Sequence, residues 1–127
     1  MSVEVKNYLE EEVVEEVYAD TVSIAPNTTT PSKVESGTIR QGYKAVAVSV
    51  AVTRDANCYF FLKIDGKQIY SNGLNCAGIG AGANLENETL LLVPIKEGGT
   101  WEIGFTNKSA SAVTLSYRFR LRLFKVR

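Results

Sequence analysis

The sequence predicts an all-β protein, an antiparallel β-sandwich of about 7–8 strands that is jelly-roll-like and carries an N-terminal arm. Three observations predict it. From Val113 to Leu123 every odd position is apolar and every even position is polar, as in a long strand with one face in a core. Residues 43–54 alternate branched with very small side chains. Asp65–Gly66 lies between two strand-like runs and is a strong hairpin signal, because a type I′ turn needs two residues at positive φ.

Residues 1–20 are predicted to form an arm separate from the sandwich domain, which is assigned to residues 21–127. Apolar side chains recur every four residues among many glutamates, the pattern of an amphipathic helix with a narrow apolar stripe. The valines and the like-charged glutamate pairs disfavour a helix, so a helical and an extended arm both stay open. We expect the apolar side chains of the arm to contact a neighbouring surface, since an isolated helix of this length is marginal in water. These interface candidates are Leu9, Val13, Val17 and Tyr18.

The strands of the sandwich are predicted from apolar runs bounded by turn residues. They are residues 20–25, 43–54, 58–64, 67–71, 89–95, 101–106 and 113–127. Residues 27–36 are polar and contain a proline, so we expect a surface loop there. In residues 43–54 the valines occupy one face of the predicted strand, and alanines and a serine occupy the other. This pattern predicts a strand covered on both faces, or one whose small-residue face is open to water. A jelly roll is preferred to an immunoglobulin-like sandwich because Trp101 follows both cysteines.

The composition argues against an enzyme. The 14 basic residues balance the 14 acidic ones, and there is no histidine, the commonest general base and metal ligand. No nucleophile motif is visible, and nothing places two carboxylates in a cleft. The glycines of residues 78–82 lack the helix and the βαβ unit that a phosphate cradle needs. We therefore predict a protein that is not an enzyme and holds no cofactor and no metal.

Two further features bear on the location of the protein. No apolar run approaches the roughly 20 residues needed to span a membrane, and the N-terminus lacks the basic and apolar regions of a signal peptide. We therefore expect synthesis in the cytoplasm and no membrane partner. Cys58 and Cys76 follow no metal-binding spacing, and we expect free thiols rather than a disulfide.

A row of arginines is the most distinctive charged feature. Arg118, Arg120 and Arg122 are spaced by two residues, about 7 Å apart along one face of the last strand. Such a row suits an acidic partner, for which the N-terminal glutamates are available, or it is simply a solvated face. Nucleic-acid binding is the weaker alternative, because the stacking aromatics Tyr117 and Phe119 point the opposite way.

The order of the elements resembles small structural proteins of tailed phages and related viruses. Residues 93–124 carry the resemblance, with a strand that contains proline, a glycine turn, an aromatic strand, an Asn-Lys-Ser turn and a long final strand. The resemblance implies a virion protein, a jelly-roll-like decoration or accessory protein on a capsid or tail. It also implies a homo-oligomer, with a trimer favoured, whose N-terminal arms contact neighbours. It assigns no functional residue.

A carbohydrate-binding module of lectin type is the alternative function. Sugar sites pair an aromatic platform with amide side chains, and the candidates are Tyr59, Tyr70, Trp101 and the glycine-rich loop of residues 72–84. Trp101 alternates in phase with Ile103 and Phe105, which also suits a role in core packing.

Overall fold

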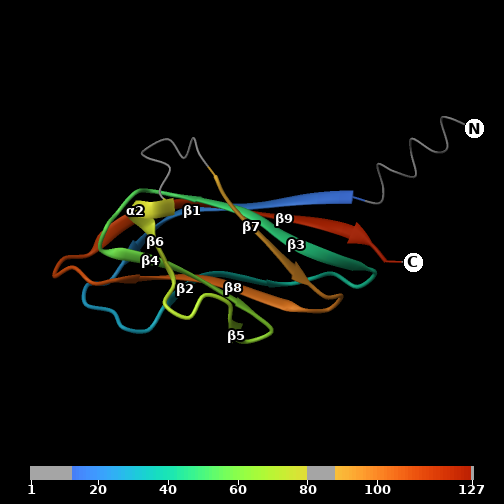
Figure 1. Ribbon diagram of the computed structural model, residues 1–127, viewed down its shortest axis with the longest axis horizontal. Coiled ribbons are helices and arrows are strands. Elements are labelled where there is room, and N and C mark those ends of the chain that lie inside the picture. Colours follow the sequence, from blue (N-terminus) through green and yellow to red (C-terminus); the bar gives the residue numbers. More distant parts are fainter. Residues whose placement is uncertain (1–12, 80–87, 127) are drawn as a thin grey trace, which may run out of the picture.

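The computed structural model describes residues 13–79 and 88–126 and confirms the predicted all-β class. Two antiparallel sheets face each other as the layers of a sandwich (Figure 1). One sheet has the strand order β1-β9-β3-β7 and the other β2-β8-β4-β5, with β6 also paired to β4. If β5 and β6 are taken as one position, this is the strand order of a jelly roll. The elements are β1 (Val13–Ile24), β2 (Ser32–Thr38), β3 (Tyr43–Val52), β4 (Cys58–Ile64), β5 (Lys67–Gln68), β6 (Leu74–Asn75), α2 (Cys76–Ile79), β7 (Thr89–Ile95), β8 (Thr100–Asn107) and β9 (Val113–Lys125).

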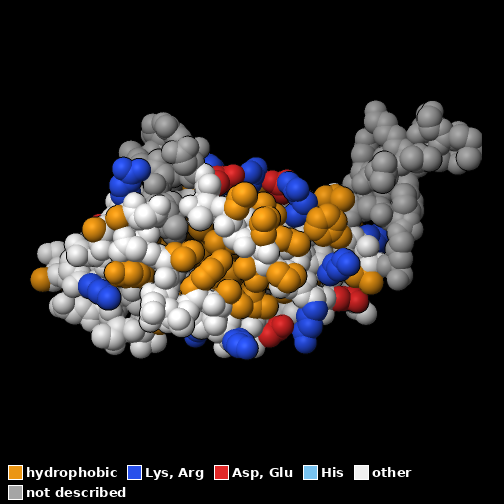
Figure 2. Space-filling view, viewed as in Figure 1, with side chains coloured by type: hydrophobic (Ala, Val, Ile, Leu, Met, Phe, Trp, Pro, Cys, Tyr) orange, Lys and Arg blue, Asp and Glu red, His pale blue; other side chains and the backbone are white. Residues whose placement is uncertain are grey.

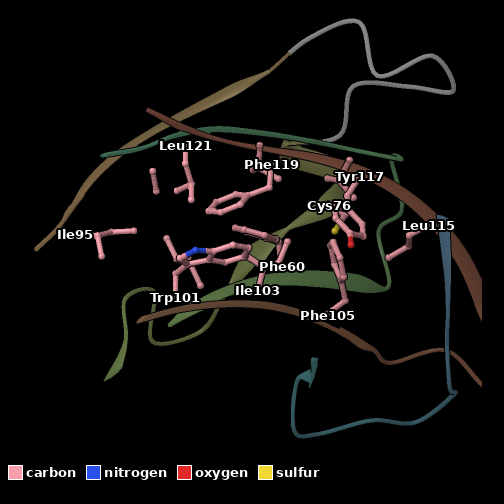
Figure 3. Close-up of a cluster of buried hydrophobic side chains, with 14 of the residues drawn as sticks. Phe60, Cys76, Ile95, Trp101, Ile103, Phe105, Leu115, Tyr117, Phe119 and Leu121 are labelled. Carbon is pink, nitrogen blue, oxygen red and sulfur yellow. The ribbon is translucent and has the colours of Figure 1, made fainter. Parts of the chain in front are cut away.

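Strand β9 supplies the centre of the core, as its alternation predicts. Its odd-numbered side chains are almost completely buried, from Leu115 to Leu123. They pack against the inner face of β8 (Figure 3): the rings of Phe119 and Trp101 are 5.1 Å apart, and those of Tyr117 and Phe105 are 6.0 Å apart. Tilted aromatic pairs of this kind add to the free energy gained from burial. The predicted packing role of Trp101 is therefore confirmed.

Strand β1 decides between the helical and the extended alternative for residues 13–20 of the predicted arm. Residues 13–20 are extended, not helical, and β1 pairs with β9 over all of its 12 residues, from Val13 opposite Phe124 to Ile24 opposite Val113. The expected boundary at residue 20 thus falls inside a strand. The physical reason is that valines, which lose rotamer freedom in a helix, fit a sheet well. Leu9 and the other residues before 13 lie outside the described residues.

The predicted loop at residues 27–36 is also partly wrong, because Ser32–Thr38 forms the edge strand β2. It is polar because its outer side is open to solvent, and its pairing with β8 shifts by one residue between Lys33 and Glu35. Gly37 lies against the indole of Trp101, and a Cβ there would be 2.8 Å from a ring carbon. A side chain at residue 37 would therefore displace the tryptophan.

Strand β3 is interrupted by a bulge between Ala47 and Ser49. Ala47 faces the core before the bulge and Val50 faces it afterwards, so the valine and alanine faces exchange in mid-strand. Ser49 and Ala51, on the opposite face, are buried too. The prediction that both faces are covered is confirmed for this half of the strand.

The hairpin between β4 and β5 is as predicted. Asp65 and Gly66 both have positive φ, 54° and 80°, as a type I′ turn requires. The Asp65 carboxylate also accepts a hydrogen bond from the backbone N–H of Thr100 at 2.9 Å, which ties the turn to the start of β8.

Candidate interaction surface

The three arginines project from β9 onto the outer face of the four-stranded sheet, where two carboxylates flank them. Glu15 on β1 contacts Arg120 at 3.0 Å and Arg122 at 3.5 Å. Glu88, just before β7, contacts Arg120 at 3.0 Å and Arg118 at 3.3 Å. The central guanidinium is thus shared between carboxylates on both sides of its strand. Glu15 belongs to the glutamate-rich N-terminal segment. At least one of the glutamates expected to pair with the arginine row therefore does so within the same chain.

These ion pairs set the electrostatic character of the face. All of the side chains are partly exposed, so each pair is worth about 0–1 kcal/mol and is weakened by salt. Among the described residues, Glu15 and Glu88 are carboxylates in contact with the three guanidinium groups. A phosphate backbone would have to displace the carboxylates before it could use the whole row, which disfavours the nucleic-acid alternative.

The interface candidates on β1 divide between the two faces of the strand. Val13 and Val17 share the outer face with the arginine row, and their exposed fractions are 43% and 49%. Tyr18 points the other way, with its ring 4.8 Å from that of Trp101 and its hydroxyl donating to Glu16. Burial first, and then the Glu16 carboxylate, raise the pKa of Tyr18 to about 12. Tyr18 is therefore partly buried and packs against the core within its own chain.

The side of the sandwich between β1 and β2 is closed by polar contacts. The Tyr117 hydroxyl donates to Glu35 of β2 at 3.1 Å, and the Arg40 guanidinium pairs with Glu16 of β1. Burial and the neighbouring Glu35 carboxylate raise the pKa of Tyr117, so the phenol remains a donor. These contacts join the edge strands of the two sheets on this side.

The opposite side, along β7, is apolar and exposed. Leu90 and Leu92 have exposed fractions of 67% and 60%, and Ile69, which follows β5, has 38%. Figure 2 shows hydrophobic side chains gathered over β7 and the region between the two sheets on this side. We call Ile69, Leu90 and Leu92 the β7 patch. The sequence reading missed it, although the unbroken apolar run of β7, without alternation, was a signal that both of its faces avoid charge.

The backbone of β7 is unsuited to pairing with a further strand. Leu92 has a positive φ of 54° beside the bulge that β7 shares with β3. Pro94 has no N–H to donate. Because β7 is the edge of its sheet, these features leave side-chain packing, not strand addition, as its means of association.

A groove with a volume of about 530 Å³ lies against the outer face of the other sheet. Tyr59 and Asn72, two of the candidates for sugar binding, line it together with Phe61, which the sequence reading missed. Tyr70 packs against the core cluster, and Trp101 is buried inside it. The structure therefore separates the predicted sugar-binding residues into two groups.

Several carboxylates have structural roles. Asp55 accepts from the backbone N–H of Asn57 at 2.8 Å, and Glu97 accepts from that of Gly42, so both stabilise turns. Within residues 13–79 and 88–126, no group of three or more cysteine, aspartate or glutamate side chains is placed to hold a metal ion. Among the same residues, no helix is long and apolar enough to cross a membrane.

Comparison by sequence finds no relative: no protein-family model matches the chain, and no curated protein matches it. Comparison by structure finds the infectious bursal disease virus VP2 subviral particle, with a TM-score of 0.50 and 11% identity. The match covers 87% of this chain but only 31% of the viral chain. At this identity the likeness establishes a shared fold, a β-sandwich also present in a viral capsid protein.

Two further structures match with lower TM-scores. One is a subunit of the disulfide-linked pili of Bacillus endospore appendages, with a TM-score of 0.35, 14% identity and coverage of 91% of this chain and 90% of that one. The other is a serine protease of Aeromonas sobria, with a TM-score of 0.38, 14% identity and coverage of 90% of this chain and 27% of that one.

Proposed function

We propose that this chain is a structural protein of a virion, of the capsid decoration or accessory type, that has no enzymatic activity and assembles as a homo-oligomer. The sandwich shared with a segment of VP2, a protein that forms a subviral particle, supports the virion assignment. The carboxylates of Asp55 and Asp65 accept hydrogen bonds from backbone amides, which supports the assignment of a role without catalysis.

The β7 patch is the observation that carries this proposal. Two leucines with well over half of their surface in water are costly on an isolated subunit, because each loses the free energy gained by burial, about 1.5–3 kcal/mol for a whole side chain. Exposed apolar groups that cluster on one side of a protein mark a contact surface. A second copy of the chain is the proposed occupant, with its own β7 patch against this one or against an adjoining apolar surface.

The N-terminal segment provides the second proposed contact. Strand β1 is an edge strand with no break in its pairing to β9, so its free edge is regular over its length. The glutamates that precede it are suited to the basic side chains of a neighbour. We assign residues 1–12 to contact with an adjacent subunit and Val13 and Val17 to the margin of that contact.

Native mass spectrometry and light scattering of the full chain test the proposal. We expect an oligomer, with a trimer as the favoured state, and dissociation to monomers in the double variant Leu90→Ser, Leu92→Ser. The matched control is Val126→Ser, which removes an exposed apolar side chain that belongs to neither proposed contact and is expected to leave the oligomer intact. A wild-type chain that stays monomeric throughout the micromolar range would overturn the proposal. Circular dichroism shows whether each variant keeps its fold.

A further inference from the structure

The groove on the outer face of the five-stranded sheet is separate from the β7 patch and the arginine row. Its floor comes from β4, whose alternation sends Tyr59 and Phe61 outward while Phe60 faces the core. Thr106 of β8 lies beside them. The walls come from the segment between β1 and β2 and from the segment after β5, which lie below this sheet in Figure 1. Its volume of about 530 Å³ is within the usual range for ligand sites, about 300–1,000 Å³.

Two half-buried aromatic rings form its apolar part. Tyr59 and Phe61 are two residues apart on one strand, so their rings stand on the same face of the sheet. Phe61 also lies against the backbone of Gly73, where a Cβ would be 2.7 Å from its ring. Gly73 has a positive φ of 72°, so the turn that positions the ring needs a glycine. The Phe61 ring is therefore held in place by the fold.

The polar part consists of amides and hydroxyls. The Gln68 side-chain nitrogen donates to the carbonyls of Tyr70 and Ser71, at 3.0 and 2.8 Å, which fixes the amide. Its Oε1 accepts no hydrogen bond from the part of the chain that the structure describes. The side chains of Asn72 and Thr29 also line the groove and are exposed to solvent. These groups can donate to and accept from a ligand rich in hydroxyls.

The groove contains a single kind of charge. Lys108 is the charged side chain among its lining residues, and its ammonium lies 4.5 Å from the centre of the Tyr59 ring. This cation–π contact holds the ammonium over the groove. Within residues 13–79 and 88–126, no carboxylate forms an ion pair with Lys108. The charge is therefore available to an anionic group on a ligand.

We propose that this groove binds an acidic saccharide. The C–H face of a sugar ring packs on Tyr59 and Phe61, its hydroxyls bond to Gln68 and Asn72, and its carboxylate pairs with Lys108. A wholly apolar ligand is disfavoured, because most of the described lining residues carry amides, hydroxyls or the ammonium of Lys108. The inference does not depend on oligomer formation or on the β7 patch.

The test is NMR titration of the full ¹⁵N-labelled chain with two acidic probes, sialyllactose and a galacturonate oligomer, and two neutral ones, lactose and a glucose oligomer. We expect an acidic probe to shift amides of the groove and to bind at least about tenfold more tightly than its neutral counterpart. Tyr59→Ala should abolish binding, and Lys108→Gln should reduce the acidic probe to the affinity of the neutral one.

Tyr43→Ala is the matched control. Tyr43 also has a cation over its ring, Arg40 at 5.3 Å, but it starts β3 at the other end of the sandwich, so its loss should leave binding unchanged. If Tyr59→Ala does not fold, the exposed Lys108→Gln variant decides alone. The proposal is overturned if no acidic probe shifts groove amides, if acidic and neutral probes bind equally, or if the control loses binding as Tyr59→Ala does.

Discussion

At the scale of single residues, the close contact of Gly37 with Trp101 is the most sensitive feature of the core. Three atoms of the indole lie within 2.9 Å of the position that a Cβ at residue 37 would occupy. Trp101 in turn contacts Tyr18 and Phe119, so it cannot move without disturbing both sheets. The glycine is required by the close approach of an edge strand to this ring.

Gly37→Ala should therefore destabilise the fold by about 1–3 kcal/mol, the usual cost of overpacking. Urea unfolding followed by tryptophan fluorescence measures it. Gly78→Ala is the control, because a Cβ there meets nothing within 4 Å. Equal stability of the two variants would show that Trp101 has room to shift.

Ser49 lowers the stability of the fold from the face of β3 that points away from the core. Its hydroxyl is buried and has no hydrogen-bond partner within the described part of the chain. Ser49→Ala should raise the free energy of unfolding by up to about 1 kcal/mol, because it removes a buried polar group without a partner. The Ser116 hydroxyl forms a hydrogen bond of 2.8 Å with that of Thr21 on the same sheet, so Ser116→Ala should lower the free energy of unfolding. Thermal unfolding of both variants decides; a lower midpoint for Ser49→Ala would contradict the expectation.

At the scale of elements, the sequence predicted the strands that are marked by apolar runs between turn residues, including β7, and missed the polar edge strand β2. Strand β9 and the Asp65–Gly66 hairpin were correct because alternation and turn chemistry are local signals. Strand β1 was predicted only from residue 20, and its first half stayed open between helix and strand, because a spacing of four residues, as between Val13 and Val17, fits one face of either. Strand β2 was missed because an edge strand can be polar on both sides.

The candidate surfaces were predictable only in part, for a related reason. Tyr59, Asn72 and the arginine row could be singled out by residue type. The β7 patch and the position of Phe61 depend on which strand is an edge and which face is outward, and both are set by long-range pairing. Pro94 and the unbroken apolar run are local signals for β7, but neither shows which of its faces is outward.

The attachment of β1 to β9 provides a prediction at this scale. Glu15→Gln removes the carboxylate that pairs with Arg120 and Arg122. The free energy of unfolding should fall by less than about 1 kcal/mol, and this difference should shrink as salt is added, because these pairs are partly exposed. Unfolding in low and high salt measures it, and Thr21→Val is a control on the same strand that carries no charge. A loss independent of salt would show that the glutamate acts through packing.

At the scale of the whole molecule, two thiols and a phenol determine how the stability of the fold changes at high pH. Burial raises the pKa of the thiols of Cys58 and Cys76 from 9.0 to about 12 and, with Glu16, that of Tyr18 from 10.0 to about 12. The folded chain keeps protons that the unfolded chain releases. Its stability is therefore complete below about pH 9 and declines as the pH rises toward 12.

Equilibrium unfolding across this range tests the expectation. In the double variant Cys58→Ala, Cys76→Ala the decline should begin near the unfolded tyrosine pKa, about one pH unit later than in the wild type. The thiols of the native wild type should also react slowly with a disulfide reagent at about pH 8 and quickly after unfolding. A stability that is constant up to about pH 11 would contradict the expectation.

The position of β9 between β1 and β3 has a consequence for biosynthesis. Strand β1 is made first, yet its only sheet partner among the described strands is made last. During translation β1 must wait, with both of its edges unpaired, until residues 113–125 have left the exit tunnel. The pairing of β1 therefore follows the synthesis of β9, and the nascent chain is open to chaperones and to misassociation until this strand is available.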